Sequence, residues 1–114
     1  MAKTKNAKDV VIVKVYENDN LVGFAMCYDR YPGHFHLWEL GVLKEHRHKG
    51  IASAIYSKIE NYARKKGYQG ITMATFNIYK ESLLLALKRG YEIYSVDKTK
   101  EFEKNPKISL RLTF

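Results

Sequence analysis

The sequence predicts a mixed α/β domain in which two helices pack on one mostly antiparallel sheet. Hydrophobic residues make up 46% of the 114 residues, which is enough for one small core. Short β-branched runs bounded by turn residues are typical of strands. Two longer segments repeat apolar residues with a helical period, and each ends at a glycine. We expect residues 1–9 to be a tail and residues 10–114 to form a single domain.

The first part of the chain contains three predicted strands. Residues 10–16 and 21–28 are joined by Glu17-Asn18-Asp19-Asn20, whose turn chemistry predicts a hairpin. Pro32-Gly33 marks the loop before the third strand, residues 34–42. Regular alternation places one set of residues on a single face of that strand: His34, His36, Trp38, Leu40 and Val42.

Two helices are predicted in the second part of the chain. The first covers residues 50–66, because its apolar residues recur every three or four positions at Ile51, Ile55, Ile59 and Tyr62. Gly67 follows a run of cations and provides its cap. The second helix covers residues 77–89 and ends at Gly90. We expect three of its residues to face the core: Leu83, Leu84 and Leu87.

Three further strands complete the sheet, at residues 71–75, 91–96 and 108–114. The predicted order is therefore β-β-β-α-β-α-β-β. A helix joins the third and fourth strands, so these two should be parallel. We expect the remaining strands to pair antiparallel.

Charge and composition restrict the class of function. The net charge of +8 favours anionic ligands over cationic ones. Cys27 is the only cysteine, so no disulfide can form within the chain, and we interpret it as a small buried hydrophobe. No apolar run approaches the length of a membrane span, and no signal-peptide core follows the basic start. We therefore expect a cytoplasmic protein that does not enter a membrane.

The most informative motif is Arg47-His48-Lys49-Gly50-Ile51-Ala52, which joins the third strand to the first helix. A helix start leaves several backbone N–H groups without partners, and the helix dipole adds partial positive charge there. Gly50 allows backbone and ligand to approach closely. The motif therefore predicts a site for a phosphate or pyrophosphate.

The element order and this turn resemble the GNAT superfamily of acyl-coenzyme A-dependent N-acyltransferases. Residues 40–52 match the family's strand, Arg/Gln-x-x-Gly-x-Gly/Ala turn and helix without a gap. Lys88-Arg89-Gly90-Tyr91 resembles its later glycine-aromatic signature, and the resemblance covers residues 10–114. It implies an acetyl-CoA-dependent N-acetyltransferase that acts on an amine. The implied coenzyme-binding residues are Leu40, Val42, Arg47, His48, Lys49, Gly50, Ile51, Ala52 and Asn77.

The resemblance also suggests catalytic residues on the third strand. His36 is the first candidate for the general base, and Glu39 is the second, although strict alternation places it on the opposite face unless a bulge intervenes. Active relatives commonly carry a proton-donating tyrosine where this sequence has Ala86. Tyr79, Ser82 or water would take that role, or the thiolate would leave without assistance, or transfer would be weak.

Several alternatives remain open at the level of sequence. The chain resembles a short GNAT form without the usual N-terminal strand and helices, so the acceptor pocket is open, completed by a homodimer partner, or missing. A reduced domain that binds acyl-CoA without transfer is one alternative, and a basic nucleic-acid-binding module is a less favoured one. His34-x-His36 and His46-x-His48 have the spacing of metal ligands, but without the cysteines or carboxylates that zinc prefers we expect no metal.

Overall fold

The computed structural model describes residues 8–31 and 33–114, and most of the predicted tail lies outside this part. Six strands form one sheet in the order β1-β2-β3-β4-β6-β5. The predicted order of strands and helices is confirmed. The elements are β1 (Val10–Glu17), β2 (Asn20–Tyr31), β3 (His34–Val42), α1 (Ile51–Lys66), β4 (Gly70–Phe76), α2 (Lys80–Lys88), β5 (Glu92–Asp97) and β6 (Lys107–Thr113). Short 3-10 turns lie at Lys44–His46 and Lys100–Phe102.

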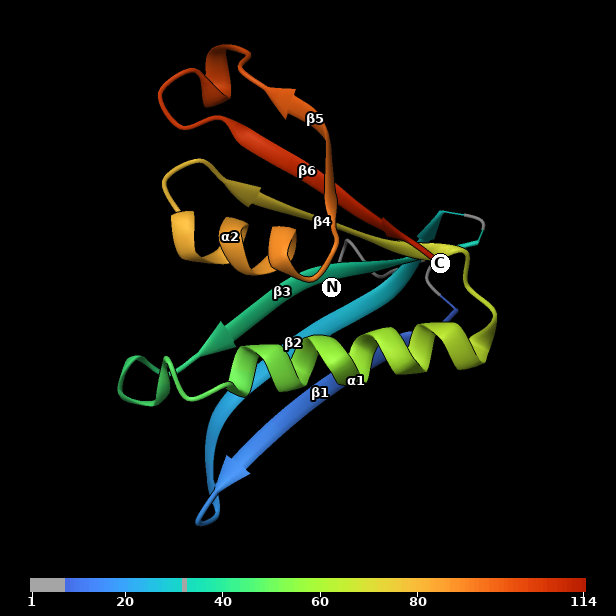
Figure 1. Cartoon of the computed structure of the whole chain (residues 1–114), viewed down its shortest axis with the longest axis vertical. Helices are drawn as coiled ribbons and strands as arrows, with labels where there is room; N and C mark the ends of the chain where they lie inside the picture. Colours follow the sequence, from blue (N-terminus) through green and yellow to red (C-terminus); the bar gives the residue numbers. More distant parts are fainter. Residues whose placement is uncertain (1–7, 32) are drawn as a thin grey trace.

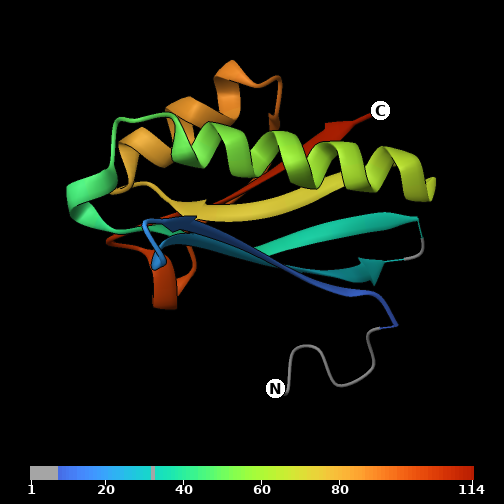
Figure 2. The same cartoon turned by 90° about the horizontal axis from the view of Figure 1, so that it is seen from below.

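Only the β3–β4 pair is parallel among the strand pairs of the described residues, as the helical crossover predicts. Both helices lie on the same face of the sheet, with α1 beside α2 (Figures 1 and 2). We call the opposite side the second face. Neither helix is long and apolar enough to cross a membrane.

The core lies between α1 and the face of the sheet that the two helices cover. Ile55, Ile59 and Ala63 are buried on α1 at the predicted helical spacing, and they pack in one cluster with strand residues such as Phe35 and Ile71. Gly67 ends the helix in the left-handed conformation, with φ of 86°. The prediction of an amphipathic helix capped by this glycine is confirmed.

Cys27 also lies in this cluster, with 1% of its surface exposed. Burial raises the pKa of its thiol to about 12. The interpretation of Cys27 as a small buried hydrophobe is therefore confirmed.

The packing of α2 differs from the prediction. Ala86 is fully buried, whereas Leu84 is 56% exposed and Leu87 is 39% exposed. The three predicted leucines lie on one stripe of α2, but the side of the helix that faces the core carries Ala86, so most of that stripe lies near the surface. The expectation that Leu84 and Leu87 face the core was therefore wrong. Of the three predicted leucines Leu83 alone packs partly against the core, and Leu85 does so as well.

A β-bulge in β3 changes which residues share a face. Met26 of β2 lies opposite Glu39, and the next residue, Cys27, lies opposite Leu37, so Trp38 is the extra residue. Beyond the bulge the alternation is reversed. Leu40 and Val42 face the helices, whereas His36 and Glu39 both lie on the second face. The regular alternation expected for residues 34–42 was therefore wrong, and the bulge brings the two candidate bases to one side.

Candidate functional site

The parallel strands β3 and β4 separate toward their carboxyl ends. They pair only from His34 opposite Gly70 to Leu37 opposite Met73, and beyond these residues β3 continues alongside β2 alone. We call the region between the unpaired ends of β3 and β4 the wedge (Figure 1). Because β3 and β4 are parallel, their carboxyl ends lie at the same edge of the sheet, so the segments that follow both strands border the wedge.

Along the end of β3, the backbone N–H and C=O groups of every second residue point into the wedge. Leu43 donates its N–H to the Val22 carbonyl on the β2 side, at 2.9 Å. Because successive residues of a strand point their polar groups in opposite directions, the N–H and C=O groups of Leu40 and Val42 face the wedge. The Val42 carbonyl accepts a hydrogen bond there from Arg47 Nε at 3.2 Å. The N–H and C=O groups of Leu40 and the N–H group of Val42 therefore offer an edge with which an extended ligand can pair.

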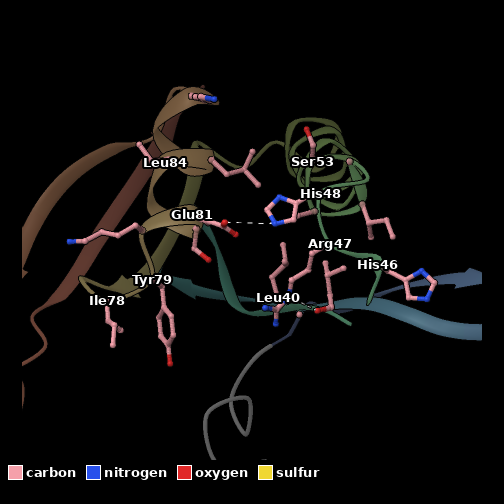
Figure 3. Close-up of a pocket in the computed structure, with 18 residues that line it drawn as sticks. Leu40, His46, Arg47, His48, Ser53, Ile78, Tyr79, Glu81 and Leu84 are labelled. Carbon is pink, nitrogen blue, oxygen red and sulfur yellow. Dashed lines mark hydrogen bonds and ion pairs between the residues drawn. The ribbon is translucent and has the colours of Figure 1, made fainter. Parts of the chain in front are cut away.

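A pocket of about 800 Å³ lies between the end of β3, the start of α1 and the first turns of α2 (Figure 3). Its lining combines backbone-rich turns, apolar side chains and several cations. The lining residues are Leu40, Gly41, Val42, His46, Arg47, His48, Gly50, Ile51, Ala52, Ser53, Ile78, Tyr79, Lys80, Glu81, Ser82, Leu84, Leu85 and Lys88.

We call residues 47–52 the phosphate turn. His48 and Gly50 both adopt the left-handed conformation, with φ of 62° and 80°, and Lys49 between them does not. Such alternation turns successive N–H groups toward one concave side, which suits an anion. Within residues 8–31 and 33–114, no hydrogen bond occupies the backbone N–H groups of residues 48–53. The turn thus presents unpaired donors at the positive end of a long helix.

Side chains of the turn and of His46, the residue before it, reach three neighbouring elements. His46 Nδ1 lies 3.0 Å from a Glu17 carboxylate oxygen at the β1–β2 hairpin, and Arg47 contacts the Val42 carbonyl. His48 Nε2 lies 3.7 Å from Glu81 Oε1 on α2, so this contact spans the pocket (Figure 3). Glu81 is the only acidic residue among those that line the pocket in the described part of the chain.

The two candidate bases differ in availability. His36 is 6% exposed, with Nδ1 2.8 Å from Thr72 Oγ1 and Nε2 3.2 Å from Arg30 Nη1. An arginine can only donate, so Nε2 accepts and Nδ1 carries the proton that is donated to Thr72. The accepting nitrogen of His36 is therefore engaged. Glu39, in contrast, is exposed on the second face.

The structure brings most of the predicted coenzyme-binding residues together at the pocket. Lys49 and Asn77 do not line it, and the Asn77 side-chain oxygen accepts a hydrogen bond from Lys80 Nζ at 2.9 Å. Tyr79 and Ser82 were named from the sequence as alternatives for the proton donor, but Ser53 of α1 and the other α2 residues that line the pocket were missed. The parallel arrangement of β3 and β4 could have indicated the contribution of α2, because α2 follows β4 at the same edge of the sheet.

The residues that the structure describes contain no group of three or more His, Cys, Asp or Glu side chains that could hold a metal ion. Of the four histidines, His46 and His48 turn instead to single carboxylates.

The family model described as the Acetyltransferase (GNAT) family matches residues 2–91. This chain belongs to the GNAT acetyltransferase family. Comparison with curated proteins finds no significant match.

Solved structures share the fold at low sequence identity. A Bacillus anthracis structure, described as a streptothricin acetyltransferase in complex with acetyl coenzyme A, has a TM-score of 0.86 and 17% identity. The match covers 96% of this chain and 65% of that one, so this chain spans less than two thirds of that relative.

Two other structures with a TM-score of 0.83 are a Bacillus subtilis acetyltransferase in complex with CoA and the ribosomal-protein-S18-alanine N-acetyltransferase from Escherichia coli. The first is 18% identical, and the match covers 92% of this chain and 77% of that one. The second is 12% identical, with 95% and 71% covered. At such identities these likenesses show the fold.

Proposed function

We propose that this protein is an acetyl-CoA-dependent N-acetyltransferase that transfers the acetyl group directly to an amine. The observation that carries the proposal is one continuous pocket, in which the unpaired amides of the phosphate turn lead to the edge of β3 that faces the wedge. A diphosphate needs concentrated N–H donors, and an amide-bearing arm needs a strand-like edge. The pocket offers both, in the order in which coenzyme A carries these groups.

Acetyl-CoA supplies a thioester carbonyl that is open to attack and a thiol as leaving group. The backbone N–H groups of residues 48–53 are assigned to the diphosphate. The polar edge of Leu40 and Val42 is assigned to the pantetheine arm, and the Val42 N–H is suited to donate to the carbonyl oxygen during attack. Lys80 and Lys88 line the same pocket and add positive charge beside a polyanion.

An amine nucleophile must lose a proton to attack, and we assign this task to Glu39 in preference to His36. Both lie on the second face, but the accepting nitrogen of His36 is engaged by Arg30, whereas the carboxylate of Glu39 is exposed. Ala86 is buried and supplies no proton to the leaving thiolate. The hydroxyl groups that line the pocket belong to Ser53, Tyr79 and Ser82.

Two measurements test the proposal. Titration calorimetry with CoA tests binding, and thiol release from acetyl-CoA over a panel of amines, peptides and proteins tests transfer. Glu39→Gln should lower kcat about a hundredfold and leave the Kd for CoA unchanged, because a general base acts only during reaction. Glu92→Gln, on the second face of the distant edge strand β5, is the matched control.

Three results would contradict parts of the proposal. No heat on addition of CoA would remove its basis altogether. CoA binding without turnover on any amine would favour the alternative of a reduced domain that binds acyl-CoA without transfer. A full loss of kcat in His36→Asn, with little change in Glu39→Gln, would show that His36 and not Glu39 is the general base.

A further inference from the structure

Behind the pocket, Arg89 joins the end of α2 to the middle of α1. Its Nε donates to Glu60 Oε2 at 3.0 Å, and its Nη2 donates to Glu60 Oε1 at 2.6 Å. Glu60 is 6% exposed, so this two-pronged ion pair is largely shielded from water. Hydrogen bonding to Glu60 raises the pKa of Arg89, which keeps its charge at all ordinary pH values.

A second contact fixes the plane of this ion pair. The Tyr91 hydroxyl donates to Glu60 Oε2 at 3.1 Å, and Tyr91 is itself 2% exposed. With both carboxylate oxygens occupied from fixed directions, the guanidinium group of Arg89 is held in one orientation. Its remaining N–H groups therefore point at defined places on α1.

Those places are two serine hydroxyl groups, one turn apart on α1. Arg89 Nη1 lies 3.0 Å from Ser53 Oγ, and Nη2 lies 2.9 Å from Ser57 Oγ. Arginine has no acceptor, so each serine oxygen accepts from it. The hydroxyl hydrogen of Ser53 must then point away from Arg89. Within the described part of the chain no residue accepts it.

The two serines differ in one respect that matters for function. Ser53 lies in the first turn of α1 and lines the pocket next to the phosphate turn, whereas Ser57 is exposed and does not line it. Resting on the proposed function, we infer that Ser53 donates its hydroxyl hydrogen to the diphosphate of acetyl-CoA. Arg89 is the positioning residue that aims this hydroxyl group.

Calorimetry with CoA and with 3′-dephospho-CoA tests the role of Ser53. Ser53→Ala should raise the Kd of both ligands about tenfold, because a hydrogen bond to a charged oxygen is worth about 1.5 kcal/mol. Ser53→Thr keeps a hydroxyl group and should restore most of the affinity. Ser57→Ala removes an equivalent contact to Arg89 outside the pocket, and its Kd should stay within about twofold of the wild-type value.

The role of Arg89 is tested by Arg89→Lys, which keeps the charge beside Glu60 but loses the rigid fork. It should raise the KM for acetyl-CoA and leave kcat nearly unchanged. In the Ser53→Ala background the same substitution should have no further effect on CoA affinity, because the hydroxyl group through which Arg89 acts is already missing. A merely structural role would give additive losses.

The outcomes separate this inference from the proposed function. If wild-type protein binds CoA but Ser53→Ala binds it equally well, the inference is wrong and the proposed function stands. The inference is also wrong if the Ser53→Ala penalty disappears with 3′-dephospho-CoA, because the hydroxyl group would then serve the 3′-phosphate. Wild-type protein that binds no CoA would overturn both.

Discussion

Gly50 and Gly67 allow a matched test of the phosphate turn. They cap the two ends of α1 in nearly the same left-handed conformation, with φ and ψ of 80° and 7° at Gly50 and 86° and 16° at Gly67. An added Cβ would meet no heavy atom within 4 Å at either glycine. Alanine at either position therefore introduces backbone strain without a steric clash.

Because the strain is the same, the two variants should lose similar stability. An alanine in this conformation costs about 1 kcal/mol, which lowers the Tm of a domain of this size by about 4 °C. Thermal unfolding followed by circular dichroism measures both shifts. A large difference between the two Tm values would show that something other than φ controls one of these glycines.

The variants should differ in their affinity for CoA. Gly50 lines the pocket, so its added methyl group stands where backbone and diphosphate must approach, whereas Gly67 lies at the far end of the helix. Losing one charge-assisted hydrogen bond costs about 1.5 kcal/mol, so Gly50→Ala should raise the Kd about tenfold. Gly67→Ala should bind CoA as the wild type does. Equal affinity in both variants would refute close backbone contact at Gly50.

Three further outcomes are expected. Because Cys27 is buried with its pKa raised to about 12, Ellman's reagent at about pH 8 should leave it unmodified until the protein is unfolded; rapid labelling of native protein would contradict this. Burial raises the pKa of Asp9, but hydrogen bonds from Tyr68 and Tyr62 and the charge of Lys66 outweigh it and hold the pKa below the usual 3.8. The ionised Asp9 carboxylate thus stabilises the fold above that pH, and this stabilisation is lost as the pH falls below it. Asp9→Asn should therefore reduce the pH dependence of the free energy of unfolding in acid, and an unchanged pH dependence would contradict this expectation. Glu81→Gln removes a negative charge from the pocket and should tighten CoA binding about threefold at low salt, an effect absent from Glu101→Gln and reduced by added salt.

Local chemistry made much of this fold predictable. The spacing of Ile55 and Ile59 and the glycine at 67 determine α1, because helical period and cap act within one segment. The parallel pairing of β3 and β4 follows from the helix that connects them, because such a crossover returns the chain to the edge of the sheet where β3 began. The position of the phosphate turn was also predictable from local signals, since β3, Gly50 and α1 follow one another directly in the sequence.

The bulge at Trp38 was not predictable in this way. A large apolar side chain fits either face of a strand, so the residue pattern does not show where alternation is interrupted. The interruption depends on how β2 pairs with β3, and that is a contact between different segments. Glu39 could therefore be proposed as a candidate base from the sequence, but only the pairing of β2 with β3 places it on the same face as His36.

The orientation of α2 was also beyond sequence reasoning. Leucines at 83, 84 and 87 form an apolar stripe, and a stripe ordinarily faces a core. In the structure Ala86 is the fully buried residue, and Leu84 lines the pocket. The choice depends on how α2 fits beside α1, where Arg89 and Glu60 join the two helices.

The start of the phosphate turn and the residue before it contact three different elements. His46, Arg47 and His48 are consecutive, yet they contact Glu17 of the hairpin, the Val42 carbonyl and Glu81 of α2. These side chains contact other elements, and the backbone N–H groups of residues 48–53 have no hydrogen-bond partner among the residues that the structure describes. Under the proposed function, recognition of the diphosphate would depend mainly on the main chain, which is organised before the ligand binds. A turn with only one arginine can then offer several donors, and we expect Gly50 to matter more for CoA affinity than any single cation.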